Sequence, residues 1–151
     1  MEKGFLSGKT QENFEKAVEL EPSNVEARRY LASYYTNAPT IAGGSIKKAK
    51  KQADETMKYS YIDGQKIYVG IYLKQERYDS AIVVLDRLIQ AEPENIELHY
   101  NMGIVHQRTE NYIEALVYFQ KVLEIEPDNL EVLYQYGKTS ALSGENTEKG
   151  K

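Results

Sequence analysis

One short phrase recurs three times in this sequence and constrains its fold more than any other feature. It occurs as EPSNVE, EPENIE and EPDNLE. Its second and third prolines, Pro93 and Pro127, are 34 residues apart, and Pro22 precedes Pro93 by 71 residues, two steps of 34 plus three. A fixed period of this length is typical of repeat architectures, in which each unit buries its apolar face against its neighbours. The sequence therefore predicts a stack of similar units.

Each phrase carries the signals for the end of one helix and the start of the next. Proline cannot continue a helix, and it disfavours helical geometry in the residue before it. The asparagine two residues later can accept a free backbone N–H, and the glutamate that follows falls in the first helical turn, where the helix dipole favours negative charge. The phrase thus predicts helix N-caps at Asn24, Asn95 and Asn129.

Apolar residues follow the same period. Leu85 aligns with Phe119, and the small residues Gly103 and Gly137 align with each other. The spacing within a unit is helical, and no stretch alternates convincingly at period two, so strands are not expected. Small residues at such positions let two helix backbones approach closely, while the large residues fill the layer between them. The sequence predicts an all-α fold of paired helices.

The spacing of apolar and small residues between positions 102 and 127 resembles the tetratricopeptide repeat (TPR), whose pattern is W-x2-L-G-x2-Y, then A-x3-F, then P. The matching residues are Met102, Gly103, His106, Ala115, Phe119 and Pro127. The resemblance covers almost the whole chain. It implies a right-handed α-solenoid of antiparallel helix pairs, with about three and a half repeats and truncation at both ends.

The period also predicts how the chain is divided. We expect a second helix of a truncated repeat at 10–20, a repeat at 25–61 with an inserted loop at 36–44, repeats at 62–95 and 96–129, a truncated first helix at 130–142, and a tail at 143–151. Such ends are expected for a piece of a longer protein. They would leave Leu130, Leu133 and Tyr136 uncovered, which predicts self-association through this surface.

Composition limits the partners. The net charge of −4 argues against a general nucleic-acid footprint, and the absence of cysteine excludes disulfides and thiolate metal sites. No apolar run approaches the ~18 residues of a membrane span, and no signal peptide is evident in this chain. The wording around the inserted loop resembles that of uncharacterised bacterial TPR proteins. We therefore expect a soluble protein of the bacterial cytoplasm or periplasm.

Two features invite chemistry that the spacing does not support. The segment from Gly4 to Thr10 approaches the G-x-x-x-x-G-K-[ST] phosphate loop, but it is one residue short and lacks a preceding strand, so we interpret it as a turn. His99 and His106 lie seven helical residues apart, about 10.5 Å, too far for one zinc ion. We expect both to be packed and hydrogen-bonded. The sequence predicts no nucleotide, no metal, no cofactor and no enzyme.

The TPR resemblance implies that the first helix of each pair lines a concave groove that receives a peptide or a protein partner. Aromatic and cationic side chains in this position would anchor such a partner. The groove residues predicted on this basis are Arg29, Ser33, Lys66, Tyr100, Asn101, Gln107, Tyr134 and Lys138.

Two alternative functions remain open. Lysines 47, 48, 50, 51 and 58 make the helix after the inserted loop locally basic, with Ser45 as its expected N-cap. A regulatory or lipid-facing adaptor acting through the 36–51 segment is therefore one alternative. The other is an accessory region of a larger enzyme whose catalytic domain lies outside this chain.

Overall fold

The computed structural model describes residues 2–149, and the side chains of residues 9–144. Within this range the chain is all-α, with no β-strand. The helices are α1 Glu2–Leu20, α2 Val25–Asn37, α3 Ile46–Met57, α4 Tyr61–Lys74, α5 Tyr78–Ala91, α6 Ile96–Arg108, α7 Tyr112–Ile125 and α8 Leu130–Lys149, with a short 3₁₀ helix, η1, at Thr40–Ala42. The predicted fold class is confirmed.

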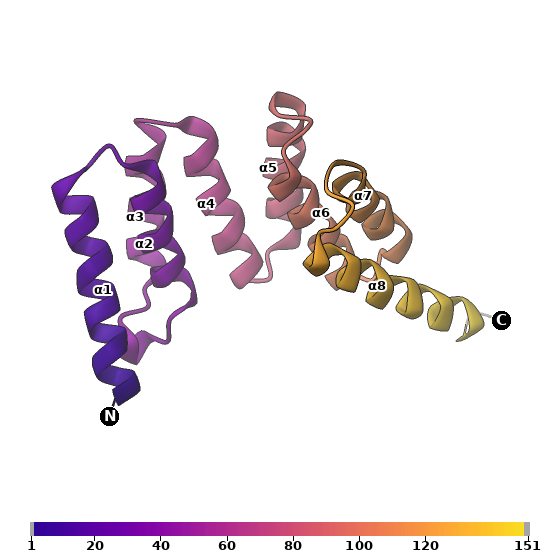
Figure 1. Cartoon of the computed structure of the whole chain (residues 1–151), viewed down its shortest axis with the longest axis horizontal. Helices are drawn as coiled ribbons and strands as arrows, with labels where there is room; N and C mark the ends of the chain where they lie inside the picture. Colours follow the sequence, from indigo (N-terminus) through magenta and orange to yellow (C-terminus); the bar gives the residue numbers. More distant parts are fainter. Residues whose placement is uncertain (1, 150–151) are drawn as a thin grey trace. The chain divides into compact units, whose positions relative to one another are not determined.

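The chain divides into two compact units, Met1–Arg77 and Tyr78–Lys151, called here the first and second units. In the first unit α1, α2, α3 and α4 pack in sequence order, and α4 also contacts α2 (Figure 1). Short turns join α1 to α2 and α3 to α4, a longer loop joins α2 to α3, and successive helices are antiparallel (Figure 1). The core of the unit contains Val18, Leu31, Ala32, Tyr35, Ala49, Ala53, Ile67 and Ile71.

The second unit repeats this arrangement with α5, α6, α7 and α8, each packed against the next (Figure 1). Phe119 lies at its centre, and it is fully buried with Ala115, Val122 and Val132. A Cβ atom added at Gly103 would lie 2.4 Å from the Phe119 ring. Glycine therefore allows α6 and α7 to approach closely here. Gly137, which shares its place in the period, faces open space instead.

The recurring phrase folds into the same small motif each time. The side-chain oxygens of Asn24, Asn95 and Asn129 accept the N–H groups of Ala27, Glu97 and Val132 at 2.9–3.1 Å. Each asparagine Nδ2 also donates to the carboxylate of the glutamate three residues earlier, at 2.6–3.0 Å. The three predicted caps are confirmed, and the glutamate before each proline fixes the asparagine that starts the next helix.

The turns within the repeats have a second common motif. Glu76, between α4 and α5, has φ 57°, and Glu110, between α6 and α7, has φ 62°. The next N–H in each turn reaches back five residues to close the helix, Arg77 to the Tyr72 carbonyl and Asn111 to the His106 carbonyl, both at 2.8 Å. These residues are 34 apart, so the period also fixes a left-handed backbone position that usually favours glycine.

Helices α1 and α8 differ from the sequence-based expectation. Residues 4–10, interpreted above as a turn, lie inside α1, which begins at Glu2; that interpretation was wrong. A helical segment has no exposed run of N–H groups with which to wrap a phosphate. At the other end, α8 continues through Ser143 and Gly144, where we expected a turn.

The segment that breaks the period is ordered. It connects α2 to α3 and contains η1, with hydrogen bonds from the Ala42 N–H to the Pro39 carbonyl at 2.9 Å and from the Ser45 N–H to the Tyr35 carbonyl at 2.8 Å. The Tyr34 hydroxyl donates to the carbonyl of Ala42. Ser45 caps α3 as predicted, accepting the Lys48 N–H at 3.2 Å.

None of the helices within residues 2–149 is both long enough and apolar enough to cross a lipid bilayer.

Candidate interaction surface

The first helices of the first unit, α2 and α4, are joined by a cluster of charges. Asp63 at the start of α4 lies 3.8 Å from the Arg29 guanidinium on α2 and 3.9 Å from the Lys66 ammonium. The Lys66 side chain is only 10% exposed, which is unusual for lysine. Ser33 lies one turn after Arg29, where its hydroxyl accepts from Asn37 at 3.3 Å. Of the predicted residues in this unit, Arg29 and Lys66 are brought together.

In the second unit neutral donors join the first helices, α6 and α8. The Tyr100 hydroxyl donates to Glu131 at 3.1 Å. About two turns further along α6, the Gln107 amide donates to Gln135 at 2.9 Å and to the Thr139 hydroxyl at 2.8 Å. Gln135 and Thr139 are not among the groove residues predicted from the sequence. Their positions, four and eight residues after Glu131, could have shown that they share its helix face.

The Tyr100–Glu131 contact changes the acidity of both groups. Burial raises the pKa of the Tyr100 phenol, and the hydrogen bond to Glu131 adds to this effect. Hydrogen bonds from Gln135 and Tyr100 lower the pKa of the Glu131 carboxyl. At neutral pH the pair is therefore a neutral phenol donating to a carboxylate, which keeps the acceptor charged at the edge of the surface.

The side chains of three predicted residues of the second unit make no hydrogen bond within the described part of the chain. Tyr134 on α8 is 64% exposed, and Lys138, one turn later, is also exposed. Asn101 on α6 is half-buried. Tyr134 and Lys138 therefore present an aromatic ring and an ammonium group side by side on α8. An aromatic side chain gives a partner a large contact area at small entropy cost.

The contacts in the two units are equivalent in the repeat. Arg29 and Tyr100 each stand five residues after the capping asparagine, and each reaches the acid in the first turn of the next first helix, Asp63 or Glu131. The partner acid is thus the fixed feature of this contact, while the donor changes from a cation to a phenol.

The histidines that invited a metal are packed against one tyrosine. The Tyr118 ring on α7 stacks on His106 at 5.6 Å and on His99 at 6.1 Å between centroids. His99 Nε2 donates to the Pro93 carbonyl at 2.5 Å. The packing prediction is confirmed, but the hydrogen-bonding prediction holds only for His99 Nε2, because Nδ1 of both histidines is buried without a partner among the described residues.

No set of three acidic, histidine or cysteine side chains able to hold a metal ion occurs in the described part of the chain.

Comparisons with known proteins agree with this architecture. Residues 96–129 match the family described as "Tetratricopeptide repeat", and residues 71–110 match the family described as "TPR repeat". No curated protein is detectably similar to the chain in sequence.

Solved structures of MamA share the fold. MamA AMB-1 is 17% identical with a TM-score of 0.64, covering 97% of this chain and 89% of that chain. MamA MSR-1 is 17% identical with a TM-score of 0.62, covering 97% and 86%. A further MamA crystal structure is 18% identical with a TM-score of 0.62, covering 89% and 77%. At these identities the likeness establishes the fold alone.

Proposed function

We propose that this chain, in which residues 71–129 match tetratricopeptide repeat families, is a protein–protein interaction scaffold that holds a peptide or a partner's helix against the first helices of its repeats. Repeats of this family typically carry no catalytic machinery. Each unit would then act by presenting side chains from its packed helices, in which the cost of ordering the surface has been met on folding.

The observation that supports this proposal most directly is the free pair Tyr134 and Lys138. Tyr100 donates to Glu131 and Gln107 donates to Gln135, and these two hydrogen bonds between α6 and α8 hold the neighbouring polar side chains in place. Tyr134, at 64% exposed, is not used in that network. An anchored rim around an exposed aromatic and a cation favours a partner with an apolar side chain next to a carboxylate.

Peptide selection tests the proposal. A displayed library of random peptides is selected on the full chain, and the affinities of the selected peptides are measured by isothermal titration. We expect Tyr134→Ala to weaken binding about tenfold or more, as loss of an aromatic anchor does. Lys138→Glu should select against acidic peptides. The control is Gln120→Ala on α7, which is exposed and lies on a second helix.

If peptides bind the Tyr134→Ala and Gln120→Ala variants equally well, this surface is not the binding site. Selection of no peptide by the full chain would contradict the scaffold proposal itself.

A second proposal concerns self-association. Leu130 is 81% exposed and Leu133 is 45% exposed on α8, whereas Tyr136, also expected to be uncovered, packs on the core of the second unit. We propose that two copies associate through Leu130 and Leu133. Sedimentation velocity over a wide concentration range should show a dimer that Leu133→Glu converts to a monomer. A wild-type chain that stays monomeric at every concentration would contradict this.

A further inference from the structure

The segment from Ala27 to Ala53 has a charge balance opposite to that of the whole chain. It contains six basic residues and no acidic residue, although the net charge of the chain is −4. Two of the six are used inside the first unit: Arg28 is buried, and Arg29 pairs with Asp63. The remaining four, Lys47, Lys48, Lys50 and Lys51, occupy the first half of α3. We call these four lysines, together with the loop of residues 38–45, the basic surface.

The loop of this surface presents one apolar side chain to solvent. Ile41 lies in η1 and is 98% exposed. The loop around it is held in shape by hydrogen bonds within the loop and by the Tyr34 hydroxyl. Gly43, at φ +100°, closes it against Gln11 of α1, whose side chain would lie 2.0 Å from an added Cβ. Ile41 is therefore fixed at the tip of an ordered loop, rather than being exposed by local disorder.

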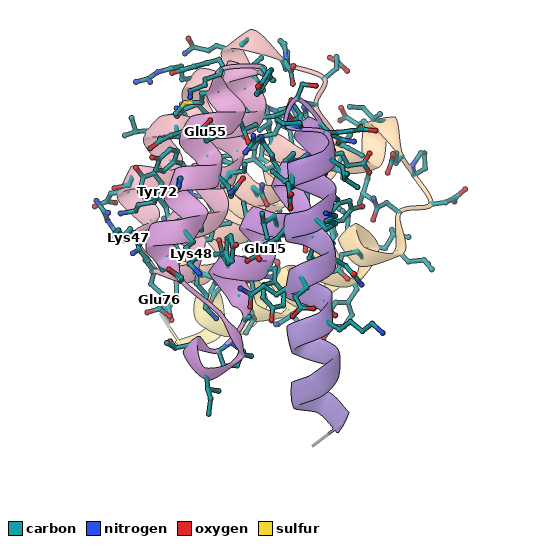
Figure 2. The ribbon with its side chains drawn as sticks, turned by 90° about the vertical axis from the view of Figure 1, so that its left-hand side faces the viewer. Glu15, Lys47, Lys48, Glu55, Tyr72 and Glu76 are labelled. Atoms are coloured by element: carbon teal, nitrogen blue, oxygen red, sulfur yellow. The ribbon has the colours of Figure 1, made fainter. Side chains whose placement is uncertain are left out.

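The four lysines follow this loop directly, on the first half of α3. Ser45 caps α3 directly after the loop, so Lys47 and Lys48 fall in its first turn and Lys51 one turn later on the same face. These three are exposed, while Ala49 and Ala53 on the opposite face are buried in the core. Figure 2 shows Lys47 and Lys48 projecting from the loop end of α3, with Glu55 at the other end.

The acidic groups near this surface are few. Glu15 on α1 is close enough to Lys48 to be affected by its charge, but its carboxylate already accepts hydrogen bonds from Tyr35 and Gln11. Glu76 follows the end of α4 and is exposed. Lys47, Lys50 and Lys51 form no ion pair within the described residues. Glu55, one turn after Lys51 on α3, accepts a hydrogen bond from Lys58 that lowers the pKa of its carboxyl, and the charge of Lys51 adds to this effect. Lys48 lies 5.6 Å from the centre of the Tyr35 ring.

We propose that the basic surface docks the protein on an anionic lipid bilayer, with Ile41 inserted between headgroups and the lysines around it contacting lipid phosphates and carboxylates. A protein partner would need several apolar and aromatic anchors in the centre of the contact. A bilayer needs only one inserted aliphatic side chain and a ring of mobile ammonium groups, because lipid headgroups rearrange around them. The observed surface has the second pattern.

Vesicle binding by the full chain tests this. The probes are vesicles of phosphatidylcholine with about 30% phosphatidylserine and vesicles of phosphatidylcholine alone, because the contribution of basic residues falls with the negative charge of the membrane. We expect binding to the anionic vesicles only, weakened by salt. Lys47→Glu with Lys51→Glu should reduce partitioning at least about 25-fold, roughly fivefold per lysine. Ile41→Ser should reduce it about tenfold, as loss of an inserted aliphatic side chain does.

A control with the same change in net charge is Lys16→Glu with Lys121→Glu, on α1 and α7, and it should leave binding within about twofold of the wild type if the lysines act locally. Tyr134→Ala should also bind vesicles normally, which separates this proposal from the scaffold function. Because the chain has no cysteine, an environment-sensitive fluorophore on Ile41→Cys reports insertion directly. Its emission should shift to the blue on anionic vesicles, and that of the same label on Gln120→Cys should not.

Several results would overturn the proposal. These are equal loss of binding in the two charge-reversal variants, equal binding to neutral vesicles, or an unshifted label at residue 41 on vesicles that do bind. Failure of the wild type to bind anionic vesicles would also overturn it, as would binding to an acidic polypeptide such as polyglutamate without any binding to vesicles. Circular dichroism of each variant confirms that the fold is retained, since all the substituted side chains are exposed.

Discussion

In the first unit the side chain six residues after the repeat proline is Arg28, and in the second it is His99. Arg28 Nε donates to the Pro22 carbonyl at 2.6 Å, and His99 Nε2 donates to the Pro93 carbonyl at 2.5 Å. Both side chains are buried. The third repeat has Leu133 there, 45% exposed. Where the side chain at this position is buried, it donates a hydrogen bond to the carbonyl of the repeat proline. Either an arginine or a histidine can supply this donor.

The contacts between first helices differ in the same way. The first unit joins α2 to α4 through the Arg29–Asp63 ion pair, while the second joins α6 to α8 through the Tyr100–Glu131 hydrogen bond. One geometry is thus met by two kinds of interaction, which differ in their response to truncation, salt and pH.

The largest expected difference concerns the buried donors. Arg28→Leu should lower the free energy of unfolding by about 3 kcal/mol, because the Pro22 carbonyl and Gln52 lose a charged donor. His99→Leu should cost only about 1 kcal/mol, since leucine keeps the packing against Tyr118 and removes an unsatisfied nitrogen. Urea denaturation followed by circular dichroism measures both.

Arg87→Leu, at an exposed site on α5, is the control for the loss of one positive charge. Equal losses for Arg28→Leu and His99→Leu would show that the two positions are equivalent after all.

The next effect separates two glycines that the sequence treats alike. Gly103→Ala should destabilise the chain by about 2 kcal/mol through overpacking against Phe119. Gly137→Ala, with open space around it, should stabilise α8 by up to about 1 kcal/mol. Thermal unfolding of the two variants should shift the midpoint in opposite directions. A shift in the same direction would mean that packing against Phe119 does not decide the outcome.

A smaller effect distinguishes the two contacts between first helices by salt. Arg29→Met should cost about 0.5–1 kcal/mol at low salt and less at high salt, because salt screens a partly exposed ion pair. Tyr100→Phe should cost about 0.5 kcal/mol, with little dependence on salt, because its donor is neutral. Urea titrations at low and high sodium chloride supply both values. Parallel salt responses would contradict the distinction.

The smallest expected effect is an acid response specific to the first unit. A hydrogen bond from Tyr35, helped by one from Gln11, lowers the pKa of Glu15 below its ordinary value of 4.5. Its contribution to stability is therefore complete above pH 4.5 and is lost as the pH falls through the lowered pKa. Glu15→Gln should flatten this limb in a pH series of unfolding midpoints, and Glu12→Gln, on an exposed face of α1, should not.

Local chemistry explains which parts of the fold were predictable. The caps at Asn24, Ser45, Asn95 and Asn129 depend on contacts within a few residues, and all four were predicted correctly. The buried layers around Phe119 followed from the helical spacing. The donor role of Arg28 was not foreseen, because it requires knowing that the position is buried and that the carbonyl six residues earlier lies within reach.

The length of α8 was not predicted, because its end also depends on packing beyond the local sequence. Gly144 takes the place in the period of Glu76 and Glu110, where a turn occurs, but α8 passes through it as helix. The residues after Gly144 are polar and offer no apolar stripe for a following helix to bury, so nothing favours the turn over one more helical hydrogen bond. Of the surface residues, the sequence indicated the helix faces but not their pairing across α6 and α8.

The glutamate–proline–asparagine joint has a consequence for how such a chain changes length. Every hydrogen bond that the asparagine side chain makes runs to a residue at most three positions away along the chain. A copied or deleted segment of 34 residues would therefore carry its own complete junction and break none elsewhere. Gain or loss of a whole 34-residue unit therefore leaves the remaining junctions intact. A change of length that is not a multiple of 34 has to be accommodated in a loop, such as residues 38–45 before α3.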